Sequence, residues 1–523
     1  MEILLAAPGT GKTTKTKAII DERFKDASNI LILSFTNATV NDLNNSFERY
    51  DNVHCYTLHK YALLINHLPE HHILSKLEIT YLEKFSEKLN VNFNVLCETL
   101  RCMTFDMMIS GSITFIRSNP IYAESRIGHI DLLIVDEFQD FNETERSLLE
   151  LLYEYASDVI ILGDDDQSIY GFKNADPEAL IGIYNSEDSL KIPHEHICYR
   201  CPDEVVSCSS NLIRMNTTRI DKEWHLGNKK GEVQVLQGKN QEVVNAYIIK
   251  TLNELRRDFS DESVLILSSV KIATLPVLRA LDENGIGYTN FMNKDLSKSE
   301  FYLIWWLRAI YGTQPFLNVV FLLCHFKLHS KVKLIEKFKD YIKNTSLQNE
   351  LLSLILSYEP FKIPLSEYLN TKPDLNIFFK DNPEFVIFRD YIDESSLSRS
   401  IEEIVKNYSE STSFDNHGIN AMTIHKSKGL QADNVFILGL TEGLFPNKKE
   451  GTDNIESQRR VLFVGMTRAL KRLWLISCIE WDSADIQSSM ADKSQFGFKG
   501  RQIMTGRMSS FIDEMGLRVK PIR

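Results

Sequence analysis

Residues 3–14 read ILLAAPGTGKTT, a short apolar run followed by a glycine-rich turn, a lysine and two threonines. The apolar run predicts a strand and the pattern from Thr13 to about Arg23 predicts a helix, so the turn lies where a strand becomes a helix. Backbone N–H groups of such a turn point at anionic oxygens, and Lys12 reaches the terminal phosphates of a nucleotide. The stretch therefore predicts an α/β fold that begins with a phosphate-binding loop. A plain helix-start turn is the alternative, because Ala6 stands where the usual pattern has its first glycine.

A second stretch, residues 133–140, reads LIVDEFQD and joins a buried-type strand to two adjacent carboxylates. Phosphoryl transfer needs one group that holds a metal and another that orients the attacking water. We expect Asp136 to bind Mg²⁺ together with Thr13, and Glu137 to act on the water. ATP and Mg²⁺ are therefore the predicted cofactors. The residues expected to surround the phosphates are Ala7, Pro8, Gly9, Thr10, Gly11, Lys12, Thr13 and Thr14.

Strand and helix patterns alternate twice along the chain, with long helix-like segments between them. More than a hundred residues separate the phosphate-binding loop from the acidic strand, too many for a minimal nucleotide fold, so a segment is inserted there. The simplest account is an α/β fold of two parallel-sheet domains, each with a helical insertion. The expected bounds are 1–60 and 120–195 for the first domain, 61–119 for its small insertion, 196–311 and 413–523 for the second domain, and 312–412 for its insertion.

The composition limits the class of partner. The chain has 523 residues, 43% of them hydrophobic, and a net charge of −12. This charge argues against a protein that coats duplex DNA through bulk electrostatics, but it leaves single-strand binding by aromatic stacking open. The apolar stretch 301–326 is interrupted by Arg308, Gly312 and Pro315, so we expect two buried helices there and not a membrane span. Since no basic leader precedes the first strand, we expect a cytoplasmic protein without a membrane partner.

Three of the eight cysteines, Cys198, Cys201 and Cys208, lie close together in the sequence. Eight cysteines in a chain of this length do not resemble a disulfide framework. A metal or iron–sulfur cluster is one interpretation, but the sequence offers no evident fourth ligand nearby. We therefore expect buried reduced thiols.

Seven short segments follow one another in order: SFTNA (34–38), YTLH (56–59), DEFQD (136–140), GDDDQSIYGF (163–172), YR (199–200), TIHKSKGL (423–430) and VGMTRA (464–469). They resemble motifs Ia, Ib, II, III, IV, V and VI of the UvrD/Rep-type superfamily-one DNA helicases, and the likeness covers nearly the whole chain. The resemblance implies two RecA-like domains. It also implies an ATP hydrolase that moves along single-stranded DNA with 3′-to-5′ polarity and acts at single-strand/duplex junctions.

The resemblance assigns roles around the nucleotide. Side chains in loops that follow parallel strands lie at the ligand-binding edge of an α/β sheet, and there Glu137 is the expected catalytic carboxylate and Gln167 the residue that couples ATP to DNA. Tyr199 would stack on adenine. Arg200 and Arg468 would close on the γ-phosphate from the second domain as arginine fingers.

Aromatic residues beside the nucleotide loops suggest a single-strand site, since bases stack on exposed rings. The resemblance places Phe35 and Phe172 in the strand channel, whereas packing in the protein core is the alternative for each ring. The other residues expected to contact DNA or to couple it to ATP are Thr36, Asn37, Thr57, His59, Tyr170, Lys173 and His425.

Three departures from the family pattern bear on function. Only Met1 to Leu5 precede the phosphate-binding loop, where relatives carry a glutamine that reads adenine. Gln431, the last residue of the predicted ATP-binding set, stands where relatives carry a glutamate that contacts the ribose. Both insertions look short, and because duplex separation depends on them, we expect translocation more than vigorous unwinding.

Two other hypotheses fit the same residues. One is an ATP-gated, DNA-sensing subunit that regulates a partner nuclease in a defence or repair system. The other is an RNA-directed motor, because stacking platforms do not distinguish the sugars. No part of the sequence suggests a nuclease domain of its own.

Overall fold

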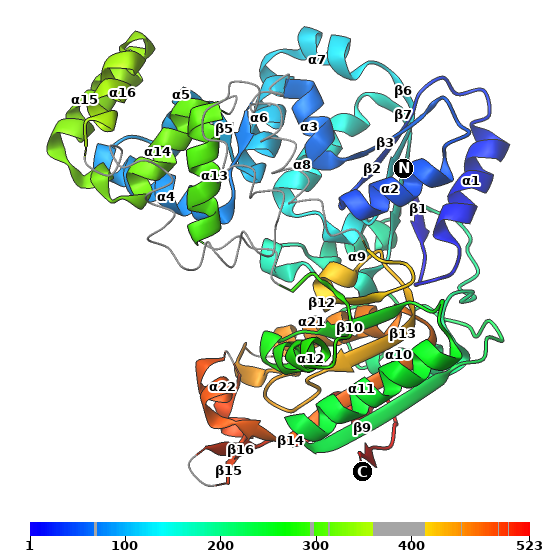
Figure 1. Cartoon of the computed structure of the whole chain (residues 1–523). Coiled ribbons are helices and arrows are strands. Elements are labelled where there is room, and N and C mark those ends of the chain that lie inside the picture. Colours follow the sequence, from blue (N-terminus) through cyan, green and yellow to red (C-terminus); the bar gives the residue numbers. More distant parts are fainter. Residues whose placement is uncertain are drawn as a thin grey trace. The chain divides into compact units, whose positions relative to one another are not determined.

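The computed structural model describes residues 1–66, 71–292, 298–311, 314–358, 414–450, 452–489, 491–499 and 502–522. The chain divides into two compact units, residues 1–61, 115–292 and 414–523 in the first and residues 62–114 and 293–413 in the second. The first unit holds two β-sheets with helices packed against them, and the second is built mainly of helices (Figure 1).

The first sheet of the first unit has six parallel strands in the order β3-β2-β6-β7-β1-β8. The strand that precedes the phosphate-binding loop and the strand that precedes Asp136 are both buried, and β7 lies between them. Their carboxyl ends therefore meet at one edge of the sheet, where ligands bind in such folds. The strands are β1 Glu2–Leu5, β2 Ile30–Ser34, β3 Val53–Thr57, β6 Ile130–Val135, β7 Ala156–Gly163 and β8 Leu190–Lys191; the helices are α1 Lys12–Arg23, α2 Asn37–Ser46, α3 Leu58–Asn66, α7 Pro120–Ile127, α8 Glu143–Tyr153 and α9 Pro177–Asn185.

The second sheet of this unit runs in the order β11-β12-β10-β13-β14-β16-β15, and β14 also pairs with β9, which pairs with β17. Its strands are parallel except where β16 joins β14 and β15. They are β9 Glu232–Asn240, β10 Val264–Ser268, β11 Thr289–Asn290, β12 Ile419–Thr423, β13 Ala432–Leu438, β14 Ala469–Asp482, β15 Gly497–Phe498, β16 Ile503–Thr505 and β17 Lys520–Pro521.

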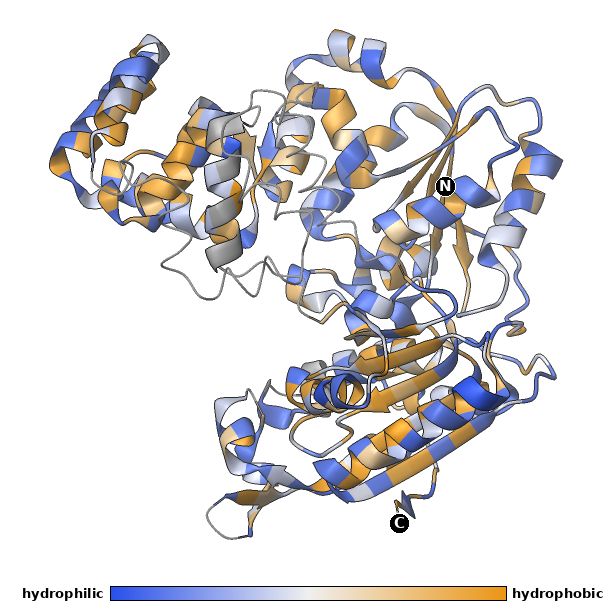
Figure 2. Cartoon of the chain, in the orientation of Figure 1, coloured by the Kyte–Doolittle hydropathy of each residue, from blue (hydrophilic) through white to orange (hydrophobic). Residues whose placement is uncertain are grey.

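Helices cover both faces of the second sheet. Residues of α11 (Gln241–Asp258) and α12 (Lys271–Glu283) share one apolar cluster with the strands, and residues of α10 (Asp203–Ile213) and α21 (Thr452–Met466) share the other. The strands of both sheets are predominantly hydrophobic in Figure 2, as expected for sheets covered on both faces. Two short helices, α22 Ser483–Ser488 and α23 Ser510–Glu514, complete this part of the chain. The predicted α/β fold with two sheets is confirmed; the first sheet is parallel, and the second is parallel except at β16.

The second unit joins helices from both insertions around one core. Trp305 of α13 donates a hydrogen bond over 2.9 Å to the buried carboxylate of Glu78 in α4, and its ring packs beside Phe321 of α14. Residues 301–326 form α13 and α14, as the interrupted apolar stretch predicts. The elements are α4 Lys76–Leu89, α5 Phe93–Thr99, α6 Phe105–Ser118, α13 Lys298–Tyr311, α14 Pro315–His325, α15 Val332–Lys343, α16 Gln348–Leu356 and the paired strands β4 His72–Ile73 and β5 Cys102–Met103.

The predicted helical character of 312–412 holds for α14 to α16, while residues 359–413 lie outside the described part of the chain. Among the helices that the structure describes, none combines the length and the apolarity that a membrane crossing requires.

Candidate functional site

The phosphate-binding loop connects β1 to α1 through two residues in the left-handed region, Gly9 with φ +72° and Gly11 with φ +84°. Gly11 is the N-cap of α1, and the hydroxyl of Thr10 donates to the carbonyl of Ala7 over 2.8 Å. A Cβ atom on Gly9 would lie 2.4 Å from the Cβ of Arg200. Glycine is therefore required at position 9 both by the backbone conformation and by the approach of the residue from the second α/β half.

Lys12 lies against the two carboxylates that end β6. Its Nζ is 2.7 Å from Asp136 Oδ1 and is also paired with Glu137. Burial disfavours the charged lysine, but the two carboxylates outweigh it and raise the pKa of Lys12. The loop lysine is therefore a permanent cation at the place where the sequence predicts nucleotide phosphates.

Asp136 fits the predicted metal site. The carboxylate is buried, and burial raises its pKa against the opposing charge of Lys12. Its Oδ1 lies 2.7 Å from Lys12 Nζ, and a carboxylate oxygen can accept a second contact beside that one. The hydroxyl-bearing Thr13 lines the same cleft. A buried carboxylate oxygen with spare acceptor capacity beside a hydroxyl is a donor set that suits Mg²⁺.

Glu137 is held in a strained conformation beside Lys12. It is a non-glycine residue with φ +56°, a conformation that costs on the order of 1–3 kcal/mol and is typical of functional sites. The amide of Gln139 donates to Glu137 Oε2 over 2.7 Å. Burial raises the pKa of Glu137, but the charges of Lys12 and Lys428 lower it more, so the carboxylate is ionised.

Lys428, which follows the turn after β12, connects the second α/β half to the end of β6. Its ammonium donates to the backbone carbonyl of Gln167 over 2.8 Å and is paired with the buried carboxylate of Asp140. It also lies 3.4 Å from Glu137 Oε2. Burial raises the pKa of Asp140 to about 7, although Lys428 opposes the shift. Lys428 lies in the segment that resembles motif V, but the sequence pattern predicts no role for it or for Asp140.

The two predicted arginine fingers face the phosphate-binding loop from the second α/β half. The backbone N–H of Tyr199 donates to the carbonyl of Gly9 over 2.9 Å, which holds Arg200 against the loop. Arg468 is only 2% exposed, and its guanidinium donates to neutral acceptors on Val464, Leu430 and Thr467.

The electrostatic state of Arg468 follows from this environment. Burial, aided by the nearby charge of Arg200, lowers the pKa of Arg468 to about 9. The hydrogen-bond acceptors of this buried guanidinium on Val464, Leu430 and Thr467 are all neutral, so its charge is available to stabilise an anion.

One cleft of ≈ 1280 Å³ brings these groups together. It is lined by every residue that the sequence predicts for ATP, catalysis or metal: Ala7, Pro8, Gly9, Thr10, Gly11, Lys12, Thr13, Thr14, Asp136, Glu137, Gln167, Tyr199, Arg200, Gln431 and Arg468. His194 also lines the cleft, and its Nε2 lies 2.9 Å from Thr10 Oγ1; no sequence pattern predicts this residue at the site. Such a convergence of loop N–H groups, carboxylates and arginines is what phosphoryl transfer requires.

Five of the predicted DNA residues form an aromatic cluster next to this cleft. Tyr170 is its centre, with ring centroids 5.0 Å from Phe35 and 5.9 Å from Phe172. Phe172 is 69% exposed and lies 5.5 Å from the ring of His425. The ammonium of Lys173 lies 5.2 Å from the Phe35 ring centroid. The cluster thus combines an exposed ring with a cation, a suitable platform for stacked bases.

The remaining DNA candidates have local structural contacts. Thr36 is the N-cap of α2, and Asn37 is the first residue of that helix. Thr57 accepts the backbone N–H of Lys60 over 3.2 Å at the start of α3. His59 Nε2 lies 3.4 Å from Glu145 Oε1. The structure therefore gives each of Thr36, Thr57 and His59 a contact within the protein.

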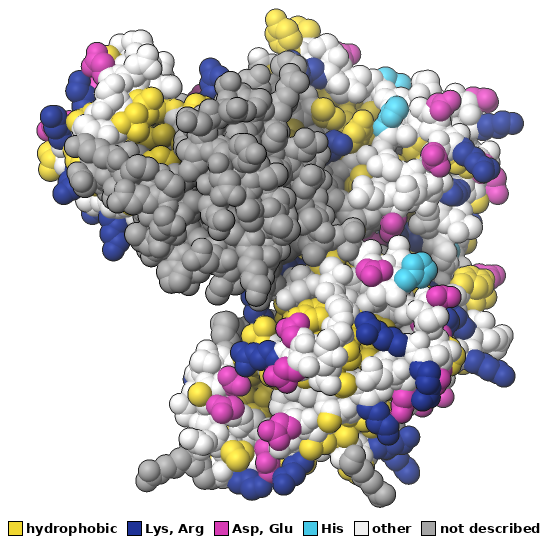
Figure 3. All heavy atoms as spheres, viewed as in Figure 1, with side chains coloured by type: hydrophobic (Ala, Val, Ile, Leu, Met, Phe, Trp, Pro, Cys, Tyr) yellow, Lys and Arg dark blue, Asp and Glu magenta, His cyan; other side chains and the backbone are white. Residues whose placement is uncertain are grey.

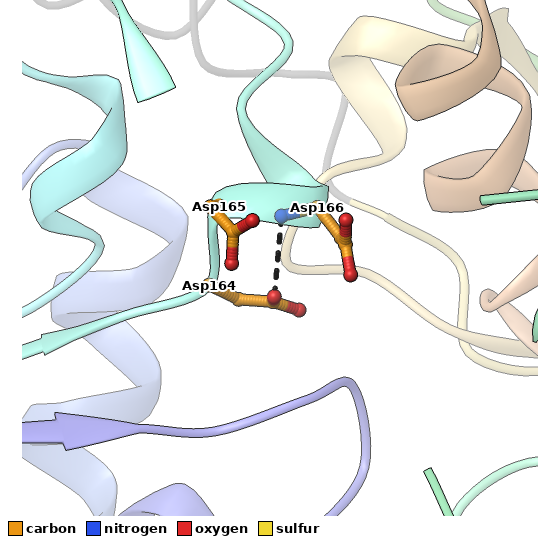
Figure 4. Close-up of side chains that lie close together, drawn as sticks. All are labelled: Asp164, Asp165 and Asp166. Atoms are coloured by element: carbon orange, nitrogen blue, oxygen red, sulfur yellow. Dashed lines mark hydrogen bonds between the residues drawn. The ribbon is translucent and has the colours of Figure 1, made fainter. Parts of the chain in front are cut away.

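Three consecutive carboxylates, Asp164, Asp165 and Asp166, lie close together in Figure 4. Lys222 lies 3.0, 2.6 and 2.7 Å from them in turn, and Arg219 donates twice to Asp166. These cations account for the cluster without a metal ion. Cys198, Cys201 and Cys208 are buried and unlinked, and in the described part of the chain they belong to no group of potential metal ligands.

Comparisons with known proteins agree with this geometry. The UvrD-like helicase C-terminal domain matches residues 384–480, and an AAA domain matches residues 1–173. The two matches and the relatives below support a UvrD/Rep-like helicase of superfamily one.

Several relatives carry helicase names. It is 24% identical over 437 residues to the ATP-dependent DNA helicase Rep of Buchnera aphidicola subsp. Schizaphis graminum, covering 72% of this chain and 66% of that protein. It is 23% identical to the putative ATP-dependent DNA helicase YjcD of Bacillus subtilis, covering 75% and 57%, and 23% identical to the ATP-dependent DNA helicase PcrA of Staphylococcus epidermidis, covering 71% and 58%. The chain thus spans less than two thirds of the length of these relatives.

Proposed function

We propose that this chain is an ATP-dependent translocase on single-stranded DNA that separates strands at single-strand/duplex junctions. The observation that carries the proposal is the single cleft in which the phosphate-binding loop and the β6 carboxylates of one sheet face Arg200 and Arg468 of the other. A nucleotide bound there would contact both halves, so its hydrolysis would change the contacts that each half makes with DNA.

The chemistry follows from the charges in the cleft. Loop N–H groups and Lys12 would bind the β- and γ-phosphates, and Arg200 and Arg468 would stabilise the negative charge that develops on the γ-phosphate. Thr13 and Asp136 would hold Mg²⁺, which supplies further charge neutralisation at the phosphates. Glu137, ionised and fixed by Gln139, would orient the attacking water and accept its proton.

The contacts of Lys428 support a coupling route from the cleft to the aromatic cluster. Its ammonium reaches the carbonyl of Gln167 at the cleft and also lies 5.6 Å from the ring centroid of Tyr170. The hydroxyl of Tyr170 donates to the carbonyl of His425 over 3.4 Å, three residues before Lys428. A nucleotide that displaces Lys428 from the carboxylates would therefore act on the rings that are expected to stack on bases.

The deciding experiment measures ATP turnover by the purified chain with and without a single-stranded DNA oligonucleotide, beside a matched RNA. Strong stimulation by DNA, lost in Lys12→Ala and Glu137→Gln, is the expected result. Equal stimulation by RNA would favour the RNA-directed motor. ATP binding with no stimulation by either strand would contradict the translocase and favour the DNA-sensing subunit.

The direction of movement, 3′-to-5′, rests on the family resemblance. Strand displacement on partial duplexes with either a 3′ or a 5′ single-stranded tail tests it. Displacement that requires the 3′ tail is expected, and a requirement for the 5′ tail would refute the proposed polarity.

A further inference from the structure

Two cysteines enclose the two motif IV residues that face the nucleotide cleft, in the order Cys198-Tyr199-Arg200-Cys201. This segment leads through a proline into α10, which begins at Asp203. Cysteines three positions apart near the start of a helix are an arrangement that favours thiol–disulfide chemistry. The proposed hydrolysis mechanism uses the residues between these cysteines but neither thiol.

Contacts of the pair link the two arginine fingers. The backbone N–H of Cys201 donates to Cys198 Sγ over 3.3 Å. The thiol of Cys201 in turn donates to the carbonyl of Thr467 over 3.4 Å. Thr467 directly precedes Arg468, so the thiol pair connects the turn that carries Arg200 with the turn that carries Arg468.

The phosphate-binding loop covers this pair from the other α/β half. A Cβ atom on Gly9 would lie 3.1 Å from Cys198 Sγ, and the Tyr199 N–H donates to the Gly9 carbonyl. Both thiols are buried in the structure. A separation of the two halves during an ATP cycle would remove the loop from Cys198 and admit a small reagent.

Cys198 is suited to react first. Polar contact with Cys201, including its backbone N–H, lowers the pKa of the Cys198 thiol to about 6, against the opposing effect of burial and with help from the charge of Arg200. The thiol of Cys201 has a raised pKa and keeps its proton. An asymmetric pair of this kind has one attacking thiolate and one resolving thiol.

We propose that Cys198 and Cys201 are a redox-modification site: the dithiol positions Arg200 and Arg468 for ATP hydrolysis, and the disulfide disables them. The inference rests on the proposed ATP hydrolysis. The oxidant belongs to the class of low-molecular-weight disulfides, of which oxidised glutathione is the probe used below.

The exchange balances in two steps. The Cys198 thiolate attacks one sulfur of the reagent, which forms a mixed disulfide and releases one small thiolate. That thiolate takes up the proton that Cys198 lost when it ionised. Cys201 then loses its proton and attacks Cys198 Sγ, which forms the protein disulfide and releases the second thiol. Two electrons pass from the cysteine pair to the reagent, and two reduced small thiols leave.

The disulfide changes the site in two ways. Cys201 no longer has a proton to donate to Thr467, so the turn before Arg468 loses a buried contact. The two sulfur atoms also approach to about 2 Å, which pulls on the turn that holds Tyr199 and Arg200. Displacement of catalytic groups by about 1 Å can reduce turnover about 10²-fold.

The test treats the full chain with oxidised or reduced glutathione, with single-stranded DNA and ATP present so that the cleft cycles. Intact mass and peptide mapping report the Cys198–Cys201 disulfide, and ATP turnover and the affinity for a fluorescent ATP analogue report the site. We expect the disulfide to form, turnover to fall about 10²-fold and dithiothreitol to restore it. A non-hydrolysable ATP analogue should slow the oxidation, because it keeps the halves closed.

Two variants act as controls. The double variant Cys198→Ser/Cys201→Ser retains hydrogen-bond donors, and whatever its own rate, that rate should be the same before and after oxidation. Cys208→Ser, which replaces a buried thiol of α10, should respond to glutathione as the unaltered chain does. A response that depended on Cys208 would overturn the proposal.

The outcomes separate this proposal from the proposed function. If the disulfide does not form, or if it forms without changing turnover or nucleotide affinity, the redox inference is wrong while ATP hydrolysis stands. If the reduced chain does not hydrolyse ATP, the proposed function fails. In that case peptide mapping still shows whether the disulfide forms, and the affinity for the ATP analogue still shows whether it changes the cleft. Neither measurement depends on turnover.

Discussion

Lys428 and Asp140 form a buried ion pair that joins the two α/β halves, with the Lys428 side chain 6% and the Asp140 side chain 0% exposed. Removal of either partner is expected to be strongly destabilising, because breaking a buried ion pair lowers the free energy of unfolding by about 3–5 kcal/mol. The same ammonium also contacts Gln167 and Glu137. The pair therefore has a structural role and lies where the state of the nucleotide site can change it.

Lys428→Met should destabilise the chain and reduce its response to DNA. The variant leaves Asp140 buried without its cation, so we expect the free energy of unfolding to fall by up to about 3–5 kcal/mol. ATP turnover should lose most of its stimulation by single-stranded DNA. Chemical denaturation and DNA-stimulated turnover measure the two effects.

Lys426→Met is the matched control, because Lys426 lies in the same turn but is exposed and donates to the carbonyl of Phe291. The double variant Lys428→Met/Asp140→Asn should recover part of the lost stability. If Lys426→Met and Lys428→Met behaved alike, the buried pair would have no special role.

Asp140 should make stability depend on pH. Burial raises the pKa of its carboxyl to about 7 from an ordinary value of 3.8. Between these values the folded chain holds a proton that the unfolded chain has lost, so the contribution of Asp140 to stability falls as pH rises through this range and is constant above it. The difference in unfolding free energy between the unaltered chain and Asp140→Asn should therefore shrink between pH 5 and 7, as urea titrations at several pH values would show. A difference that grew with pH would mean that the carboxylate is stabilised in its charged form.

Arg468→Lys should separate nucleotide binding from hydrolysis. Lysine keeps a positive charge but loses the fork that contacts Val464, Leu430 and Thr467. Loss of an arginine finger can reduce turnover about 10³–10⁵-fold, whereas affinity for a fluorescent ATP analogue should change far less. Arg472→Lys provides the control, because Arg472 pairs with Glu262 outside the cleft. Equal loss of binding and turnover would indicate that Arg468 only supports the fold.

Gly9→Ala should be far more harmful than an ordinary glycine substitution. The new methyl group would meet Arg200 at 2.4 Å in a residue with φ +72°, so either the loop or motif IV must move. We expect ATP turnover to fall by at least about 10²-fold. Gly182→Ala in α9, where nothing lies within 4 Å of the added atom, should be neutral or stabilising by roughly 0.5–1 kcal/mol. Comparable damage from both variants would contradict the close approach at Gly9.

The sequence predicts the residues of the cleft well because each of them lies within a short local pattern. A glycine-rich turn and an acidic strand each identify their own position at a sheet edge, and the ordered motifs supply Arg200 and Arg468. The partners of buried charges are less predictable, because Lys222 reaches Asp165 across 57 residues of chain and Lys428 reaches Asp140 across 288.

The two insertions show the same limit. Each has a helical pattern in the sequence, but only the folded chain shows that Glu78 and Trp305, 227 residues apart, share one core. A periodic pattern identifies the apolar face of a helix and leaves open which other helix covers it.

Phe172→Ala should weaken single-strand binding with little effect on folding. The ring is 69% exposed, so its loss removes little buried area, whereas a stacked base contributes about 1–3 kcal/mol. We expect the dissociation constant for a single-stranded oligonucleotide to rise roughly 5- to 150-fold, with DNA-independent ATP turnover unchanged. Fluorescence anisotropy with a labelled oligonucleotide measures the dissociation constant, and a coupled assay measures ATP turnover without DNA. Phe498→Ala is the matched control, because that ring is 75% exposed in β15 and lies outside the aromatic cluster. If Phe498→Ala weakened binding as much as Phe172→Ala, or if neither did, the cluster around Tyr170 would not be the DNA platform.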